Sequence, residues 1–512
     1  MNHYSFYTFQ RILKKGRGDS KRLYPFVHIT FYLLLSLLLP RLGTSQASNK
    51  VGEEKALSSR PNIVFLLADD LGYGDVGFNG QTKIRTPHID QLAKQGKTYD
   101  HFYAGTSVCA PSRSALLSGQ HTGHTYIRGN MPAPPEGQEP LVKTGKGLFE
   151  LMQSAGYHTA AFGKWGLGFI GTSGDPLNQG LDHFYGYNCQ SLAHRYYPDH
   201  LWEDETKIEL SENAAFTKQA VYAPDLIQQK ALDYIDQQSS DTPFFLFLPY
   251  ILPHAELIVP EDSIFLSYKG KFEEQPYKGK DYGAGAINHG YSSQAYPHAA
   301  FAAMVTRLDL YLGQVMEKLK QKGLDKNTLV IFSSDNGPHI EGGADPVFFN
   351  SSGPFKGVKR DLFEGGIREP FVAWWPGRVG EGTKSSHVAA FWDLLPTFVS
   401  LADAKQKIPN NIDGISLVAD LLQEGKQQKH DYLYFELHES GGKQAVIKGP
   451  WKAIRLEVDK DPKGPLLLYN IEKDPAELTN LAGQYPKIVQ EMAGIMDRAH
   501  QPSMLFPFPA EK

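Results

Sequence analysis

Four short, continuous apolar segments, each followed directly by polar residues, constrain most strongly how this chain can fold. They are residues 62–68, 159–162, 244–248 and 329–332, and helix-like patterns separate them at residues 87–95, 148–155, 224–237 and 298–320. Continuous apolar runs of this length are typical of strands covered on both faces. Strands that alternate with helices predict a mostly parallel sheet, so we expect an α/β fold with helices flanking the sheet.

The polar residues that follow these runs predict where a functional site lies. Ligands of open parallel sheets bind at the carboxyl ends of the strands. In chain order, the residues at the four ends are Asp69 and Asp70, Lys164, His254, and Asp335 and Asn336. We therefore expect these side chains to converge on one site.

Asp69, Asp70, Asp335 and Asn336 are candidate metal ligands. All four offer hard oxygen atoms and none is Cys or His, a set that suits calcium or magnesium and argues against a typical zinc site. Either pair alone would more often cap a helix or stabilise a turn. Their joint position at two strand ends favours the metal.

The segment Cys109-Ala110-Pro111-Ser112-Arg113, continued by Leu117-Ser118-Gly119, resembles the C-x-P-S-R-x-x-x-L-[TS]-G signature of the type I sulfatases. The resemblance implies an alkaline-phosphatase-like fold and a bound calcium ion, with Cys109 joining the ligand set. It also implies that a maturation enzyme oxidises Cys109 to Cα-formylglycine, whose hydrate attacks sulfur. Arg113 matches the family arginine that holds this nucleophile.

Three further segments carry the resemblance. Lys164, in Gly163-Lys164-Trp165-Gly166, and Lys359, five residues before Glu364, match the two sulfate-binding lysines, and His254 follows a proline as the leaving-group acid of the family does. The family histidine, associated with deprotonating the hydrated nucleophile, is replaced by Gly166. His194 is one candidate substitute and substrate contact, although a single loop histidine is more often structural.

The two ends of the chain differ in character from its middle. Basic residues, a short apolar run and then Ser45 and Ala47 predict a signal peptide over residues 1–47, with a linker at 48–60. The alternative is a membrane anchor, but the run is shorter than the roughly 18 residues of a spanning helix, so no stable membrane span is expected. We expect a periplasmic or secreted protein.

Residues 61–425 form the expected catalytic domain, and residues 426–512 a smaller α+β domain. Four strand-like segments, at 431–437, 444–448, 451–455 and 466–470, precede a helix-like segment at 486–499. The short turns between the strands predict an antiparallel sheet. The region also resembles the carboxyl-terminal domain of sulfatases, through Leu468-Tyr469-Asn470 and Asp474-Pro475 among others.

Charge and cysteine content exclude some functions. Without residues 1–47 the chain keeps 45 basic and 55 acidic residues, a net charge near −10. Nucleic-acid binding needs a basic surface, so no nucleic-acid partner is expected. Cys109 and Cys189 are the two cysteines. In an oxidising compartment they could form a disulfide, but the motif favours a processed Cys109, with Cys189 a small buried residue.

The expected function is hydrolysis of a sulfate ester, most consistent with a sulfated carbohydrate substrate. Aromatic residues between Tyr185 and Trp202 and between Tyr268 and Tyr296 are candidates for a sugar-binding rim or for packed surface. One alternative is phosphate ester hydrolysis on the related fold, which generally uses Ser or Thr as the nucleophile and zinc bound by His. Another is a glycan-binding protein without catalytic activity.

Overall fold

The computed structural model describes residues 60–134, 137–143, 145–213, 216, 218–283 and 290–509. The predicted signal peptide, residues 1–47, and the predicted linker up to residue 59 lie outside the described residues. Residues 57–512 belong to one compact unit. Within the described ranges, no helix combines the length and the apolar character needed to cross a membrane.

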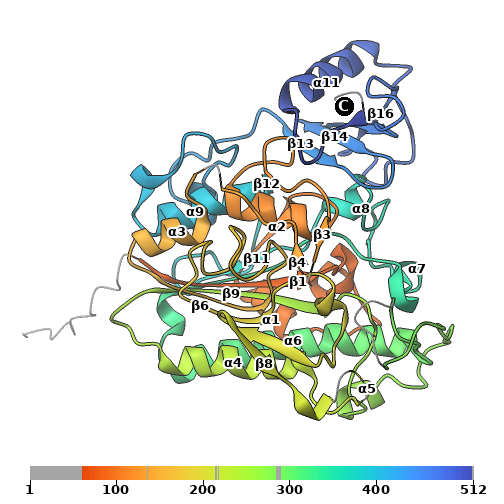
Figure 1. The fold of residues 1–512 in the computed structure, drawn as a ribbon. Coiled ribbons are helices and arrows are strands. Elements are labelled where there is room, and N and C mark those ends of the chain that lie inside the picture. The colour runs from red at the N-terminus through yellow and green to blue at the C-terminus, as the bar shows by residue number, and fades with distance from the viewer. Residues whose placement is uncertain are drawn as a thin grey trace, which may run out of the picture. The chain divides into compact units, whose positions relative to one another are not determined.

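A ten-stranded mixed sheet forms the centre of this unit (Figure 1). The strand order is β12-β2-β11-β10-β1-β9-β5-β6-β7-β8. Its strands are β1 (Asn62–Asp69), β2 (Lys97–Tyr103), β5 (His158–Lys164), β6 (His183–Tyr187), β7 (His200–Glu203), β8 (Thr206–Glu209), β9 (Phe244–Pro253), β10 (Thr328–Ser334), β11 (Val372–Trp374) and β12 (Thr383–Ala390). The strands β10, β1, β9, β5 and β6 run parallel, whereas β11, β7 and β8 pair antiparallel with their neighbours.

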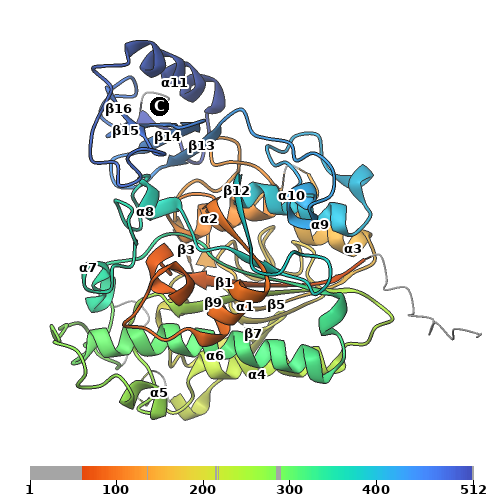
Figure 2. The same ribbon diagram turned by 180° about the vertical axis from the view of Figure 1, so that it is seen from behind.

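Helices cover both faces of this sheet (Figures 1 and 2). On one face lie α1 (Pro87–Gln95), α4 (Ala223–Gln237) and α6 (Pro297–Gln321), and on the other lie α2 (Cys109–Ser118), α3 (Leu148–Ser154) and α9 (Leu394–Leu401). Side chains along a strand alternate between the faces. Accordingly, Val64 and Leu66 of β1 belong to one apolar core, and Phe65 and Leu67 belong to the other. The continuous apolar sequence of β1 follows from burial on both sides.

A separate four-stranded antiparallel sheet lies towards the carboxyl end. It consists of β13 (Leu433–Leu437), β14 (Lys443–Lys448), β15 (Trp451–Leu456) and β16 (Leu466–Asn470). The amphipathic helix α11 (Pro486–Ala499) packs Met492 and Met496 into one apolar cluster with Val446 of this sheet. The remaining short elements are β3 (Pro132–Ala133), β4 (Gly137–Gln138), α5 (Ser263–Leu266), α7 (Pro346–Phe349), α8 (Glu364–Ile367) and α10 (Val418–Leu422).

Buried ion pairs connect the carboxyl-terminal sheet to segments next to the central sheet. Lys452 of β15 is fully buried and lies 2.8 Å from a carboxylate oxygen of Glu364, where α8 begins, and 3.2 Å from one of Glu477. Arg128, which follows α2, pairs with Glu436 of β13 at 2.9 Å. The loops after α2 and before α8 are therefore held by the carboxyl-terminal sheet.

The expected fold class is confirmed. The predicted apolar runs are the parallel strands β1, β5, β9 and β10, and the predicted helices are α1, α3, α4 and α6. Strand β9 continues through Pro253, five residues beyond the apolar run that predicted it. The other strands of this sheet, β2, β6, β7, β8, β11 and β12, are additions to the prediction. Of these, β6, β7 and β8 lie towards one edge, where β8 exposes most of its side chains and lacks a continuous apolar pattern.

Candidate active site

The carboxyl ends of the central strands bring the predicted polar residues together. Asp69 ends β1, Lys164 ends β5, and His254 directly follows β9. Register pairs Ala68 with Ser334 of β10, one residue before Asp335. Parallel pairing therefore places side chains that are far apart in sequence at one level of the sheet.

Three carboxylates and three cations form a buried network at this level. Lys164 Nζ lies 2.6 Å from Asp69 Oδ2. Lys359 Nζ lies 2.7 Å from Asp70 Oδ2. The Nε and Nη2 atoms of Arg113 lie 3.0 and 2.8 Å from one oxygen of Asp335. These six formal charges balance one another, so a divalent cation added here would leave the site positive, as the binding of an anionic ester requires.

Oxygen atoms in this network fit a hard metal ion. Asn336 donates its side-chain N–H to Asp70 Oδ1 at 2.7 Å, and the backbone N–H of Asp70 donates to Asp335 Oδ1 at 3.2 Å, so these three residues hold one another in place. Asp69 Oδ1 and Asn336 Oδ1 are buried and have no hydrogen-bond partner in the described part of the chain. Buried oxygen atoms of this kind normally have a partner. Calcium binds such carboxylate and amide oxygens.

Neighbouring charges and burial shift the pKa values of Asp69 and Asp335 in opposite directions. Burial alone would raise the pKa of Asp69, but Lys164, His254 and Arg113 together hold it below its usual range. Burial and the negative charge of Asp69 raise the pKa of Asp335 to about 7, although Arg113 opposes this shift. Without a cation, the site therefore does not hold all its carboxylates fully ionised at neutral pH.

Cys109 lies at the first position of α2, beside this network. Its side chain is buried, and burial raises the pKa of the thiol. The Sγ atom lies 3.4 Å from Gln190 Oε1 and 3.6 Å from Asn130 Oδ1. No disulfide joins it to Cys189, whose Sγ accepts a hydrogen bond from the backbone N–H of Leu192. Residue 109 thus faces polar side chains at the amino end of α2. The backbone N–H groups at the amino end of a helix favour bound anions.

His254 and Lys359 are in direct contact. Lys359 Nζ lies 3.0 Å from His254 Nε2, and the same Nε2 lies 3.3 Å from Asp70 Oδ2. His254 Nδ1 faces the carbonyl oxygen of Ala255. A carbonyl only accepts, so Nδ1 carries a hydrogen and the neutral ring keeps its lone pair on Nε2. Burial, and next the charge of Lys359, lower the pKa of His254 well below its ordinary value.

His194 lies beside His254 rather than beside Cys109. The two imidazoles stack with centroids 5.0 Å apart, and Tyr291 meets His194 edge-on at 5.5 Å. Burial lowers the pKa of His194 well below its ordinary value, and His254 adds to this effect. Among the described residues, the acceptors that face the Cys109 thiol are instead the amide oxygens of Gln190 and Asn130.

The residues that sequence reasoning missed come from loops. Gln190 and Asn130 contact the nucleophile position, and His339 stacks on His254 with centroids 5.7 Å apart. None of the three lies in a motif or at a strand end predicted from the sequence. Gln190 lies four residues before the candidate His194, in the same loop. Only its contacts with Cys109 and Gly166 in the structure identify it as a site residue.

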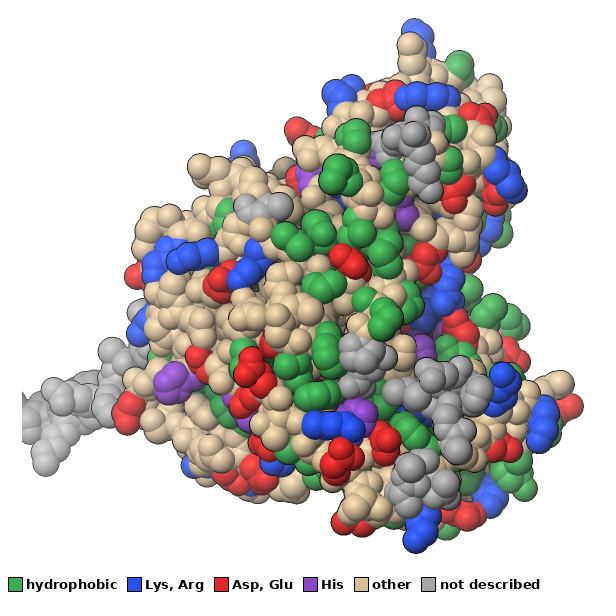
Figure 3. Space-filling view, in the orientation of Figure 1, with side chains coloured by type: hydrophobic (Ala, Val, Ile, Leu, Met, Phe, Trp, Pro, Cys, Tyr) green, Lys and Arg blue, Asp and Glu red, His purple; other side chains and the backbone are tan. Residues whose placement is uncertain are grey.

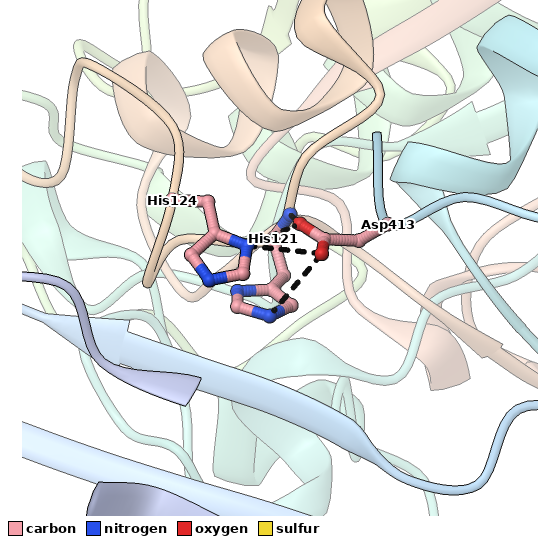
Figure 4. A group of neighbouring side chains, drawn as sticks. All are labelled: His121, His124 and Asp413. Atoms are coloured by element: carbon pink, nitrogen blue, oxygen red, sulfur yellow. Dashed lines mark hydrogen bonds and ion pairs between the residues drawn. The ribbon is translucent and has the colours of Figure 1, made fainter. Parts of the chain in front are cut away.

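A second cluster, His121, His124 and Asp413, has side chains close enough to hold a metal ion (Figure 4). Its hydrogen bonds argue against that use. Asp413 lies 2.9 Å from His124 Nδ1 and also accepts the backbone N–H of His121. His121 Nδ1 accepts the backbone N–H of Gly123, so the hydrogen of the neutral ring is on Nε2, the atom that would bind the metal. The cluster therefore links two loops.

Comparisons with known proteins agree with this geometry. The Sulfatase family profile matches residues 61–404, and the profile "N-sulphoglucosamine sulphohydrolase, C-terminal" matches residues 355–501. N-acetylgalactosamine-6-sulfatase of Mus musculus is 31% identical over 419 residues, which are 77% of this chain and 71% of the mouse protein. Arylsulfatase A of Homo sapiens is 32% identical over 486 residues, 85% of this chain and 87% of the human one.

Solved structures with the same fold include carbohydrate complexes. The crystal structure of Ps i-CgsB in complex with k-i-k-neocarrahexaose is 27% identical to this chain, with a TM-score of 0.71. The similarity covers 86% of this chain and 94% of that protein. The shared fold thus extends over nearly the whole described unit.

Proposed function

Because this chain belongs to the sulfatase family and is therefore a sulfuric ester hydrolase, we propose that it removes sulfate from carbohydrates, using formylglycine made from Cys109 and a bound calcium ion. The observation that carries the proposal is the position of residue 109. It lies at the start of α2, in a site that also contains Arg113, Lys164 and Lys359.

The cations bind the sulfate group and orient it towards residue 109. Lys164 and Lys359 are buried, and their charges act on residue 109 without screening by bulk water. Arg113 lies one helical turn after residue 109 and is fixed by Asp335, which limits its freedom to turn away. When formed, the hydrated aldehyde supplies one hydroxyl for attack on sulfur and a second whose deprotonation regenerates the aldehyde.

Asp69, Asp70, Asp335 and Asn336 would hold the calcium ion. The two buried oxygens without partners, on Asp69 and Asn336, support this assignment, together with the absence of Cys or His from the set of four. A bound calcium ion would supply positive charge for the sulfate oxygens and for the nucleophile. Hydrogen bonds hold Asp70, Asp335 and Asn336 to one another, and Asp69 is held by its ion pair with Lys164.

His254 is proposed to protonate the leaving oxygen of the ester. With Nδ1 donating to the Ala255 carbonyl, the neutral ring carries no hydrogen on Nε2. Nε2 must therefore first take a proton from the ammonium of Lys359, 3.0 Å away, before it can give one to the leaving oxygen. Lys359 donates to Nε2 and so keeps the ring oriented towards the sulfate pocket. Protonation is most useful for a sugar alkoxide, which is a poor leaving group.

The sugar is proposed to contact the residues that border His254. His194 and Tyr291 are both partly exposed there, and Tyr291 offers an aromatic face of the kind on which sugars stack. Two relatives support a carbohydrate substrate: one is named N-acetylgalactosamine-6-sulfatase, and Ps i-CgsB was solved in complex with k-i-k-neocarrahexaose. Acidic and basic side chains are interspersed on the face shown in Figure 3.

Export to the periplasm or the medium is part of the proposal. The basic and apolar segments at the start of the chain support it, and sulfated glycans are large extracellular substrates. We further propose that the maturation enzyme acts on Cys109 before the chain folds, because the side chain is buried in the folded protein.

A panel of sulfated monosaccharides and disaccharides, assayed for released sulfate, tests the substrate class. We expect turnover of at least one sugar sulfate at a kcat/KM above that for an aryl sulfate, and its loss in Cys109→Ala. Asp309→Asn, a buried carboxylate on α6, serves as a control for general destabilisation. Turnover of aryl sulfates alone, with no sugar sulfate hydrolysed, would contradict a carbohydrate substrate.

A further inference from the structure

The side chain of Gln190 fills the space next to the nucleophile that a side chain at residue 166 would need. Gly166 has a φ of +75°, in the left-handed region that favours glycine. A Cβ atom at residue 166 would lie only 2.7 Å from Gln190 Nε2 and 3.3 Å from its Cδ. Real Cβ atoms do not approach other heavy atoms that closely. A side chain at 166 therefore requires the Gln190 amide to move.

The orientation of the Gln190 amide is fixed by its two neighbours. Its Nε2 donates to the carbonyl oxygen of Gly166 at 3.3 Å, and its Oε1 lies 3.4 Å from Cys109 Sγ. Turning the amide over would place Oε1 against the Gly166 carbonyl, two acceptors without a hydrogen between them. Gln190 is also only 6% exposed, so water does not compete freely for either atom.

We propose that Gln190 is a positioning residue for the reacting side chain at 109, in the space that the missing side chain of Gly166 leaves. Its Oε1 accepts a hydrogen bond from a hydroxyl of residue 109 and fixes the direction of that hydroxyl. The inference rests on the proposed function, because the hydroxyl exists only if Cys109 is converted.

An amide differs from an imidazole in one decisive respect. Gln190 accepts a hydrogen bond but does not take the proton at any ordinary pH. The second hydrogen-bond partner of Cys109 Sγ in the described residues, Asn130, is also an amide. Neither amide therefore takes up the proton that is lost when sulfate is released, and neither adds an ionisation of its own to that step.

The first test is a stability cycle that needs no activity. It compares Gly166→His, Gln190→Ala and the double variant by urea denaturation. We expect Gly166→His to lower the midpoint more when Gln190 is present than in the Gln190→Ala background, because only in the first case must the Gln190 amide shift and give up its hydrogen bond. The cost of the positive φ is common to both backgrounds. An equal loss in both backgrounds would overturn the shared-space inference.

The second test separates the two products in time. Rapid mixing with an aryl sulfate measures the release of the phenol and of inorganic sulfate independently. We expect Gln190→Leu, which fills the space without an acceptor, to slow sulfate release about ten-fold while the first burst of phenol persists. Gln228→Ala, a buried glutamine on α4, is the matched control and keeps the wild-type order of release. A wild-type rate of sulfate release in Gln190→Leu would overturn the positioning role.

The pH profile distinguishes positioning from mere packing. The double variant Gly166→His with Gln190→Ala places an imidazole beside residue 109, so its sulfate-release rate should gain a limb that follows an ionisation near neutral pH. The wild-type rate should lack that limb. Peptide mass spectrometry of each variant reports conversion at 109: an unconverted wild-type enzyme with full activity would refute the proposed function itself, and the positioning role with it.

Discussion

Asp335→Asn should remove most of the stabilisation by calcium while leaving a folded protein. Asp335 contributes one oxygen towards Arg113 and the other towards the backbone N–H of Asp70. The amide keeps the shape of the side chain, but its NH2 group must face one of these donors. Weakening a charged hydrogen bond of this kind costs about 1.5–3 kcal/mol. Because the pKa of Asp335 is about 7 without a cation, the carboxyl is often neutral already, which favours the lower end of that range.

The effect on metal binding is larger. At a calcium concentration one hundred times the Kd, the wild type gains about 2.7 kcal/mol from binding. Losing a charged ligand from a site with three carboxylates should remove most of this gain. The assay is thermal unfolding with calcium and with chelator. Asp309→Asn is the control: Asp309 is buried on α6 and its pKa is also about 7, but it lies outside the network. An undiminished calcium shift in Asp335→Asn would refute the ligand assignment.

Three further outcomes follow from buried charges. His254→Ala should slow hydrolysis of sugar sulfates by about 10²–10⁴-fold and of activated aryl sulfates far less, as kcat on both substrates would reveal; equal losses would exclude proton donation. Burial lowers the pKa of His121 from 6.5 to about 4, so stability should be full above pH 6.5 and fall by up to about 3 kcal/mol as the pH drops to 4. In His121→Phe this slope in urea titrations should flatten, and an unchanged slope would contradict the assignment. Lys452→Met should lower the free energy of unfolding, measured by urea denaturation, by about 3–5 kcal/mol, because Glu364 and Glu477 stay buried without the lysine that pairs with both. A loss below about 1 kcal/mol would show that the two glutamates rearrange.

The sequence predicted those parts of the site that sit on regular elements. Asp69, Lys164 and Asp335 occupy strand ends, and burial of both sheet faces makes those strands visible as continuous apolar runs. Cys109 begins the helix α2. In each strand the apolar run has one physical cause, burial of the strand on both faces. A residue that directly follows such a run can therefore be placed at the carboxyl end of a strand.

The contacts of the nucleophile could not be predicted in the same way. Gln190 lies in an irregular segment where no periodicity records its direction, and its importance depends on a glycine 24 residues earlier. His194 was the candidate drawn from composition, since histidine can act as a base, yet the fold stacks it on His254. Loop side chains are placed by tertiary contacts, and a single sequence does not encode those contacts locally.

The most direct test of the central claim is the mass of the peptide that contains residue 109, measured alongside specific activity. Conversion of cysteine to formylglycine lowers that mass by about 18 Da. Preparations made with different amounts of the maturation enzyme should show sulfate-ester hydrolysis proportional to the converted fraction, extrapolating to no activity at zero conversion. Full activity in a preparation whose residue 109 is entirely cysteine would contradict the account.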